Sequence, residues 1–302
     1  MTLLVTGSIG IDTVTTPHGT AEDVLGGSAV YFSFAARHFT PVRLVGVVGE
    51  DFPDEFRKVL QKSNIDLSGL ETRAGSKTFR WTGKYVGDMN EAETAEVCLN
   101  VLAEAGPKVP AAFADSQVVF LANTHPALQR ELLGQIRRPQ LTVCDTVNHW
   151  IEHEGDEVLK TLSVVNGVII NDAESRQLTG KFNLIEAGEA LMRLGPKFAV
   201  IKKGEHGAML ITPEGPTAIP AFPTKEVRDP TGAGDSFAGG MLGYLATTGD
   251  FGPKNLRRAI VRGTVAASFV IEGFSLSRVL EVSRDDIDER VKTFVDMLRI
   301  DF

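Results

Sequence analysis

Short apolar runs that alternate with amphipathic segments constrain the fold of this chain more than any other feature of its sequence. Several runs are continuously apolar and end in a polar residue, which is typical of parallel strands buried on both faces. Their alternation with helices predicts an α/β fold with a doubly wound, mainly parallel sheet flanked by helices. The predicted strands are Leu3–Thr6, Leu44–Val48, Val118–Ala122, Leu141–Cys144, Gly167–Ile170, Phe198–Lys202 and Ala208–Ile211. The predicted helices are Ser28–His38, Pro53–Ser63, Ala127–Arg137, Ala173–Leu178, Leu184–Leu194, Asp235–Leu245, Lys254–Val270 and Arg284–Arg299.

Polar or small residues follow several of the predicted strands. Ligands of doubly wound sheets bind beyond the carboxyl ends of the strands, where the loops of neighbouring strands meet. The sequence therefore predicts a ligand site at this edge of the sheet, near Asn123, Asp145, Asn171 and Gly204.

The segment Lys77–Tyr85 breaks this rhythm, because its polar and apolar residues alternate with a period of two. Gly87–Asn90 has the composition of a turn and Thr94–Leu99 that of a second strand, so we expect a small antiparallel piece with one face in solvent. A piece of this size is not stable alone. Since the sequence has no internal repeat, low-complexity tract or long linker, we predict a single domain over residues 1–302.

Charge and cysteine content limit the kinds of partner and the cellular compartment that we expect for this protein. Lys and Arg total 31 and Asp and Glu total 39, a net charge of −8 without a basic tract, which argues against nucleic acid and anionic membranes as partners. Cys98 and Cys144 form no CxxC pair, so we expect a reducing compartment and no structural metal. No apolar stretch approaches the length of a membrane span, and the chain starts with a predicted strand, Leu3–Thr6, rather than a signal peptide. We expect a cytoplasmic protein.

Small residues and a carboxylate precede an apolar, helix-like segment in the run Asp229-Pro230-Thr231-Gly232-Ala233-Gly234-Asp235-Ser236-Phe237. Gly232, Ala233 and Gly234 let backbone N–H groups approach an anion, and the following helix adds its positive dipole end. Asp235 at the mouth of this loop can act as a base for an attacking hydroxyl. The run thus has the parts of a phosphoryl-transfer site. The alternative is a glycine-rich helix start chosen for packing.

This run resembles the C-terminal signature of the ribokinase-like sugar kinases, the PfkB carbohydrate kinase family, which reads roughly D-T-x-G-A-G-D. Other segments resemble the family in order along nearly the whole chain. The resemblance implies ATP-dependent phosphorylation of a hydroxyl, in particular a primary one, on a sugar, sugar derivative or nucleoside. Asp235 is then the catalytic base, and the N–H groups around Gly232, Ala233 and Gly234 stabilise the transferred phosphoryl group. ATP and Mg²⁺ are the expected cofactors.

The resemblance also extends to the N-terminal region. It makes Asp12, Gly26 and Gly27 contacts of the substrate, because in the family an aspartate after the first strand and a Gly-Gly pair hold the sugar hydroxyls. A carboxylate can accept hydrogen bonds from two vicinal hydroxyls. The alternative is that Asp12 is a turn residue and that the Gly-Gly pair forms a tight turn. Many family members have an Asn a few residues after the glycines, whereas this chain has Val30-Tyr31-Phe32, which indicates a more apolar pocket wall.

The family's N-x-x-E motif has a counterpart in Asn171 and Glu174, where the family binds magnesium and phosphate. Oxygen ligands of this kind suit Mg²⁺, usually through water. The alternative is a helix cap at Asn171 or Asp172, with Glu174 favoured by the helix dipole. Gly46–Phe52 resembles the family's G-x-V-G-x-D segment, in which we expect Asp51 to cap a helix.

The nucleotide is expected beside the segment Ile201–Gly207, which resembles the family's T-x-G-x-x-G loop, so the resemblance makes Gly204 and Gly207 ATP contacts. Lys202 replaces a common small residue there, and it could reach the ATP phosphates or be a solvated surface charge. Ala267 falls in the region that walls the adenine in the family. Asp229 and Thr231 could help to place oxygens around a monovalent cation such as K⁺. The roles of Asp145 and His125 stay open, the latter between substrate contact and helix cap.

By the same resemblance, residues of about 12–20 and 75–100 form a lid that covers a small-molecule substrate and can form a homodimer contact. The alternative is a surface hairpin without a gating role. Two other functions stay open: a non-catalytic nucleotide or sugar sensor on the same fold, and an oxidoreductase suggested by Gly7-Ser8-Ile9-Gly10, whose spacing fails the dinucleotide-binding pattern. The chain has no G-x-x-x-x-G-K-[ST] run, which excludes a P-loop kinase.

Overall fold

A large sheet forms the centre of the computed structural model, which describes residues 1–299. Its strands are β1 (Leu3–Thr6), β4 (Val42–Gly49), β5 (Ile65–Arg73), β8 (Val118–Leu121), β9 (Leu141–Cys144), β10 (Gly167–Asn171), β11 (Phe198–Lys202), β12 (Ala208–Thr212) and β13 (Gly215–Ile219). They lie in the order β13-β12-β11-β10-β9-β8-β1-β4-β5. All neighbours pair in parallel except β11 with β12 and β12 with β13, so the predicted mainly parallel sheet is confirmed.

The edge strands β5 and β13 were absent from the sequence prediction. β5 mixes exposed polar residues with buried apolar ones, and β13 begins with Gly215-Pro216 and has no fully buried residue. Such segments lack the continuous apolar run that marks a central strand of a parallel sheet. The seven predicted strands all occur, three of them with the predicted bounds: β1, β9 and β11.

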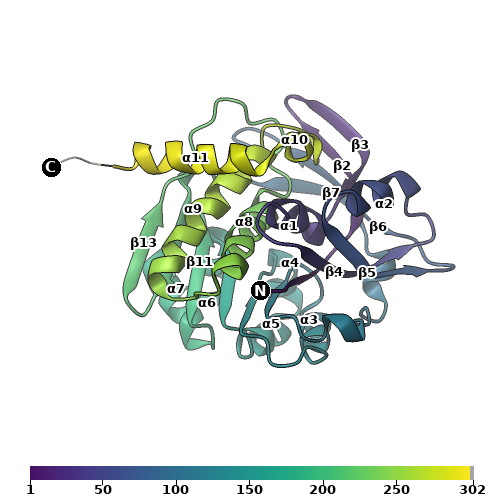
Figure 1. Cartoon of the computed structure of the whole chain (residues 1–302), viewed down its shortest axis with the longest axis horizontal. Coiled ribbons are helices and arrows are strands. Elements are labelled where there is room, and N and C mark those ends of the chain that lie inside the picture. Colours follow the sequence, from purple (N-terminus) through teal and green to yellow (C-terminus); the bar gives the residue numbers. More distant parts are fainter. Residues whose placement is uncertain (300–302) are drawn as a thin grey trace.

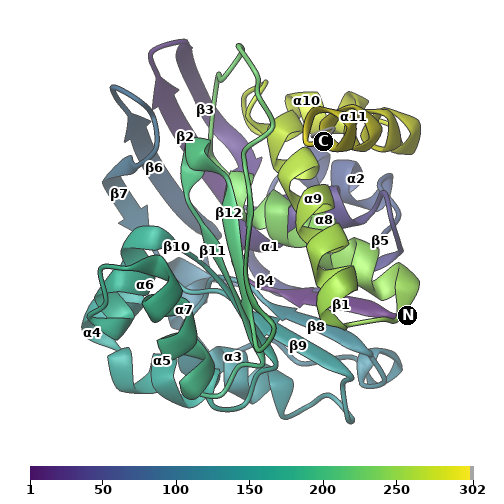
Figure 2. The same cartoon turned by 90° about the vertical axis from the view of Figure 1, so that its left-hand side faces the viewer.

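Helices cover both faces of this sheet. They are α1 (Ser28–Ala36), α2 (Asp54–Gln61), α3 (Pro126–Leu133), α4 (Asn148–His153), α5 (Gly155–Leu162), α6 (Asp172–Thr179), α7 (Leu184–Arg193), α8 (Ala233–Thr248), α9 (Pro253–Val270), α10 (Ser277–Glu281) and α11 (Arg284–Met297). Figure 2 shows α1, α8 and α9 on one face and α3, α5, α6 and α7 on the other, which is the doubly wound arrangement. The short helices α4, α5 and α10 were not predicted. No helix within residues 1–299 is long and apolar enough to cross a membrane.

The two largest apolar clusters lie one on each side of the sheet, and a smaller one lies between α9 and α11. Leu3 and Val5 of β1 face the cluster built with α1, α8 and α9, whereas Leu4 between them faces the cluster on the other side. In the first cluster the rings of Phe32 and Phe120 stack with their centroids 4.6 Å apart. Since alternate residues of one strand are buried on opposite faces, the central strands must be mainly apolar, as their sequences are.

A second, smaller sheet rises beside the carboxyl ends of the main strands (Figures 1 and 2). We call it the small sheet; its strands are β2 (Gly10–Thr16), β3 (Gly19–Gly26), β6 (Phe79–Tyr85) and β7 (Ala92–Cys98). Their order is β3-β2-β6-β7. The outer pairs are antiparallel, and the central pair β2–β6 is parallel. The segments expected to form a lid fall in this sheet.

The prediction that Asp51 caps a helix was wrong. The residue at the N-terminal cap of α2 is Pro53, and no side chain bonds that end. The Asp51 carboxylate instead accepts a hydrogen bond from the N–H of Thr78, at 2.6 Å. Thr78 lies directly before β6, so Asp51 ties the main sheet to the small sheet.

Candidate active site

A cavity of about 330 Å³ lies where the carboxyl ends of the main strands meet the small sheet. This volume is near the lower end of the range for small-molecule sites, ~300–1,000 Å³. The main strands, the small sheet and the start of α8 all contribute side chains. The lining residues are Ser8, Asp12, Gly27, Ser28, Tyr31, Phe79, Trp81, Tyr85, Asn123, Asp145, Thr146, Val147, Glu174, Lys202, Thr231, Gly232, Gly234 and Asp235.

The start of α8 forms one wall of the cavity. Gly232 is its N-terminal cap, with φ of 74° and ψ of 4°, a left-handed conformation that glycine adopts without strain. A side chain at this position would also collide with the ring of Tyr31, which packs beneath the loop. Glycine therefore serves both the backbone turn and the close packing. The first turn of α8 then brings Gly234 and Asp235 to the cavity.

Asp235 is buried, and burial raises its pKa to about 6, while the nearby Lys202 ammonium acts in the opposite direction. Asp145, at the end of β9, lines the same cavity, and its pKa is raised well above the usual range by burial and by the charge of Asp235. One carboxylate oxygen of Asp145, Oδ1, is buried without a hydrogen-bond partner. An unpaired buried acceptor of this kind is costly, so these groups favour a bound donor or cation.

Lys202 is the last residue of β11 and the only basic side chain that lines the cavity within residues 1–299. Its ammonium approaches the first turn of α8, since a Cβ at Gly234 would lie 2.6 Å from Nζ. The cavity also holds the carboxylates of Asp12, Asp145, Glu174 and Asp235. Lys202 therefore supplies the positive side chain of a strongly acidic site.

Asp12 lies on β2, directly against the two glycines that were predicted with it. Its carboxylate fills the space where a side chain at Gly26 would stand, so a glycine at position 26 leaves room for Asp12. Gly27 has φ of 101°, and its N–H bonds the carboxylate. Burial raises the pKa of Asp12 to about 7, the Gly27 N–H opposes this, and the charges of Asp229 and Asp235 add to it. Oδ1 of Asp12 is buried without a partner and faces the cavity region.

Asn171 and Glu174 form a reciprocal cap at the start of α6. The Asn171 side chain accepts from the N–H of Glu174 at 2.7 Å, and the Glu174 carboxylate accepts from the N–H of Asn171 at 2.7 Å. This arrangement is the helix cap that was the alternative to a metal site. Oε1 of Glu174 takes no part in these two hydrogen bonds, and the Glu174 side chain lines the cavity. Within residues 1–299, no three His, Cys, Asp or Glu side chains are grouped so as to hold a metal ion.

The carboxylate of Asp229 accepts hydrogen bonds from two loops. Oδ1 accepts from the N–H of Thr231 at 2.9 Å, and Oδ2 accepts from the N–H of Ser275 at 3.1 Å. Thr231 in turn lies next to the small sheet, with Oγ1 3.4 Å from the hydroxyl of Tyr85. Asp229 therefore holds the loop before α8 in place, and Thr231 joins that loop to β6.

Four of the predicted ATP contacts do not line the cavity: Asn171 at the start of α6, and Gly204, Gly207 and Ala267. Gly204 and Gly207 bracket a short turn after β11, with φ of 53° and 82°. A Cβ at Gly204 would lie 2.5 Å from Oδ1 of Asn90, so the turn between β6 and β7 reaches this loop. Ala267 is half-buried on α9. Gly26, Ala233 and Asp229 also do not line the cavity, although each adjoins a residue that does or bonds to one.

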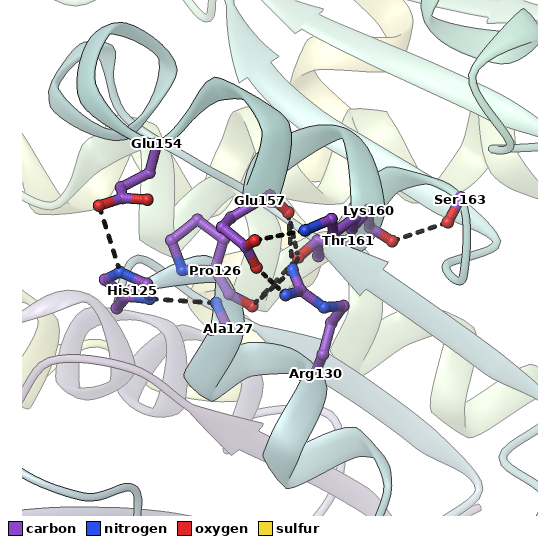
Figure 3. Close-up of polar contacts among 9 residues, drawn as sticks. All are labelled: His125, Pro126, Ala127, Arg130, Glu154, Glu157, Lys160, Thr161 and Ser163. Atoms are coloured by element: carbon purple, nitrogen blue, oxygen red, sulfur yellow. Dashed lines mark hydrogen bonds and ion pairs between the residues drawn. The ribbon is translucent and has the colours of Figure 1, made fainter.

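His125 caps α3, as one of its two interpretations predicted. Its Nδ1 accepts from the N–H of Ala127 at 3.1 Å, and its Nε2 lies 3.9 Å from the Glu154 carboxylate (Figure 3). Figure 3 also shows how Arg130 joins α3 to α5 through the Glu157 carboxylate and carbonyl. None of the residues in these contacts lines the cavity.

Sequence reasoning missed two serines of the cavity. The Ser8 hydroxyl accepts from the N–H of Ser28 at 2.9 Å, and the two hydroxyls lie 3.1 Å apart. Ser8 follows β1 within the Gly7–Gly10 stretch that had suggested a dinucleotide-binding pattern. Its position after the first strand was the available signal, whereas its pairing with Ser28 depends on the fold.

Comparison with known sequences places this chain in a family. The chain matches the model of the pfkB family carbohydrate kinases over residues 12–281. It is 32% identical over 249 residues to the cytidine kinase of Thermococcus kodakarensis, a match that covers 80% of this chain and 88% of the relative.

Solved structures show the same fold. The nucleoside kinase of Burkholderia thailandensis in complex with inosine superposes with a TM-score of 0.77 at 18% identity, over 97% of this chain and 99% of that one. The aminoimidazole riboside kinase of Salmonella enterica, complexed with aminoimidazole riboside and an ATP analog, gives 0.75 at 20% identity, over 96% and 100%. At these identities the structures establish a ribokinase-like α/β fold. The chain therefore belongs to the pfkB family of carbohydrate kinases, and as an enzyme of that family it is an ATP-dependent kinase.

Proposed function

We propose that this enzyme transfers the terminal phosphoryl group of ATP to a primary hydroxyl of a nucleoside or related sugar, with Asp235 as the catalytic base. One observation carries the proposal: Asp235 and the glycine loop at the start of α8 share a single cavity with Asp12, whose Oδ1 has no hydrogen-bond partner. A base beside an anion-binding helix start is the arrangement that phosphoryl transfer requires. Asp12 offers acceptors for the remaining hydroxyls of the same molecule.

Each step follows from the groups that line the cavity. The acceptor hydroxyl would donate its proton to Asp235 as its oxygen attacks the terminal phosphorus of ATP, and the bond from that phosphorus to the bridging oxygen would break so that ADP leaves. The N–H groups of Gly232, Ala233 and Gly234 stabilise the negative charge that develops on the transferred group, aided by the dipole of α8. Because the cavity is partly closed by the small sheet, water would be kept from acting as the acceptor.

The nucleotide would lie between Lys202 and the loop that contains Gly204 and Gly207, with the adenine towards Ala267. Lys202 can neutralise phosphate charge as a point cation. Mg²⁺ would be held through water by Asn171 and Glu174 and would neutralise phosphate charge. The free Glu174 oxygen and the absence of a three-residue metal cluster within residues 1–299 both suit an ion held largely by water and nucleotide.

A nucleoside is the acceptor that we favour among the alternatives. The relative matched over most of its length is named a cytidine kinase, and a kinase with the same fold is solved with inosine. Val30-Tyr31-Phe32 stands where many family members have an Asn, and of these three residues Tyr31 lines the cavity while Val30 and Phe32 pack in the core. An apolar wall suits a base better than a polyol.

Three further features belong to the proposal. The small sheet acts as a lid and offers the contact of a homodimer. Asp229 and Thr231 help to arrange oxygens for a monovalent cation. Both Asp229 oxygens already accept backbone N–H groups, so carbonyl oxygens of the two loops that it joins would be the main ligands. Activity with and without K⁺ tests the cation, and the mass of the protein in solution tests the dimer.

The central experiment measures ATP-dependent ADP release with Mg²⁺ across nucleosides, pentoses, hexoses, sugar phosphates and inositols. Wild type and Asp235→Asn are compared side by side. We expect a signal that depends on a nucleoside and disappears in the variant. A protein that binds ATP and a nucleoside but releases no ADP would instead be a sensor on a kinase fold.

A further inference from the structure

We infer that the indole of Trp81 is a flat platform on which the base of the acceptor stacks, and that this platform makes the site select nucleosides over free sugars. The inference rests on the proposed function and assigns acceptor choice to one residue of the small sheet. It follows from how the aromatic rings of β6 are held.

Trp81 lies along its own strand. A side chain at Gly83, two residues further on, would collide with Cζ2 and Cη2 of the indole, so the ring covers the Gly83 backbone. The indole N–H donates to Oγ1 of Thr94 on β7, at 3.2 Å. A glycine beneath the ring and a hydrogen bond at its edge hold the indole flat against the face of the small sheet.

The ring of Phe79 also lies beside a glycine, here one on the neighbouring strand. Phe79 pairs with Gly10 on β2, and a Cβ at Gly10 would lie 2.6 Å from Cδ1 of the ring. Two aromatic rings thus rest on glycines of the small sheet, and both line the cavity. Rings laid on a sheet present their faces, and the face of an aromatic ring is what a planar base stacks on.

The position of Trp81 relative to Asp12 fits a nucleoside. The two residues are direct partners in the parallel pairing of β2 and β6, and both line the cavity. Neighbouring strands lie about 4.8 Å apart. In a nucleoside the base is bonded to the carbon beside the one that carries the 2′-hydroxyl. Asp12 can therefore accept hydrogen bonds from the vicinal diol while the base stacks on Trp81, one strand away.

Free pentoses offer no planar group for this surface. A nucleoside would gain the stacking contact with Trp81 and keep the contacts of its sugar with Asp12 and Asp235. Base stacking on one aromatic side chain changes affinity by a factor of roughly 10 to 100. The selectivity for nucleosides should therefore reside in Trp81.

The test compares cytidine and adenosine with methyl β-D-ribofuranoside, which has the same sugar ring and primary hydroxyl but no base. We expect Trp81→Leu to lower kcat/KM for the nucleosides about 10- to 100-fold and to change kcat/KM for the riboside by less than about threefold. Gly83→Ala, which displaces the indole, should reproduce this pattern, and Trp81→Phe should restore part of the loss. Lys84→Ala is the matched control, because Lys84 is exposed on the opposite face of β6.

A binding measurement keeps the inference testable if a variant is inactive or misfolded. The chain has 2 tryptophans, so Trp150→Phe leaves Trp81 as the only source of indole fluorescence. Nucleosides should quench this emission to saturation, and the methyl riboside should not. Equal losses for nucleosides and riboside in Trp81→Leu, or nucleoside binding without quenching, would overturn the platform while leaving the kinase intact. If no nucleoside accepts phosphate but sugars do, the nucleoside part of the proposed function fails.

Discussion

The ammonium group of Lys202 lies against the backbone of Gly234, 2.6 Å from the point that a Cβ at residue 234 would occupy. This contact joins the end of β11 to the first turn of α8. Because Gly234 has no side chain, a cation can stand directly beside the loop that we propose as the anion hole. Lys202 also lowers the pKa of Asp235, which burial alone would raise further. One side chain thus acts on both the proposed base and the proposed phosphate site.

Replacing Lys202 with Met should therefore reduce catalysis in two ways. We expect kcat/KM for ATP to fall by about 100-fold at pH 8, because a preorganised positive group near the transferred phosphoryl is lost. The acid limb of the pH–rate profile should also move to higher pH, since Asp235 loses the charge that favours its ionised form. Steady-state kinetics between pH 5 and pH 9 measure both effects.

The matched control is Lys203→Met. Lys203 is the next residue in the chain and does not line the cavity. It should leave both kcat/KM and the acid limb near the wild-type values. If the two lysine variants behave alike, Lys202 acts only through the net charge of the protein, and its proposed place at the phosphates is wrong.

Asp235→Asn tests the base. An amide has a similar shape but accepts no proton, so we expect kcat to fall by about 100- to 10,000-fold, with ATP affinity changed by less than about threefold. In the wild type, activity should fall as the pH drops through about 6, because Asp235 must be ionised to take the proton. Isothermal titration with ATP separates lost chemistry from lost binding. Turnover near the wild-type rate in this variant would remove Asp235 from the mechanism.

Patterns local in the sequence predicted most of the fold and most of the cavity. The buried strands β1 and β11 have the predicted bounds because each is an apolar run that ends in a polar residue, and β9, which contains Thr142, also has the predicted bounds. The run around Asp235 predicted both a loop and a helix start, and the structure has both. The same spacing could not decide between a cap and a metal site for Asn171 and Glu174, because both functions need oxygens one helical turn apart.

Contacts between segments that are far apart in the sequence could not be predicted from local patterns. Trp81 lies beside Asp12 only because β6 pairs in parallel with β2, and one residue of register shift would turn Trp81 to the other face. Lys202 meets Gly234 only because β11 ends where α8 begins. Glycines at 10, 26 and 83 each make room for a specific side chain of the cavity, namely Phe79, Asp12 and Trp81, and no local pattern indicated these contacts.

Gly26→Ala should impair acceptor binding without touching the bound sugar directly. The added methyl group would occupy the space of the Asp12 carboxylate and push it aside. Since a small displacement of a positioning group can cost up to about 100-fold, we expect the acceptor KM to rise about 10- to 100-fold, with the ATP KM little changed. Gly155→Ala is the control, because no atom lies within 4 Å of the added group there. A rise in the ATP KM alone would contradict the role of Asp12.

Asp12→Asn should stabilise the free enzyme at high pH while it weakens acceptor binding. The pKa of Asp12 is about 7 in the folded protein and 3.8 for an unperturbed carboxyl, so above pH 7 the folded state holds a buried charge at a cost. This difference of roughly three pKa units corresponds to at most about 4 kcal/mol. The gain from the neutral amide should be largest at pH 8 and should shrink as the pH falls towards 4, because the folded wild type then takes up the proton itself. Urea unfolding at pH 8 and pH 5 measures this gain, with Glu22→Gln on the exposed part of β3 as the control. An equal gain at both pH values would show that the carboxylate charge of Asp12 is not its source.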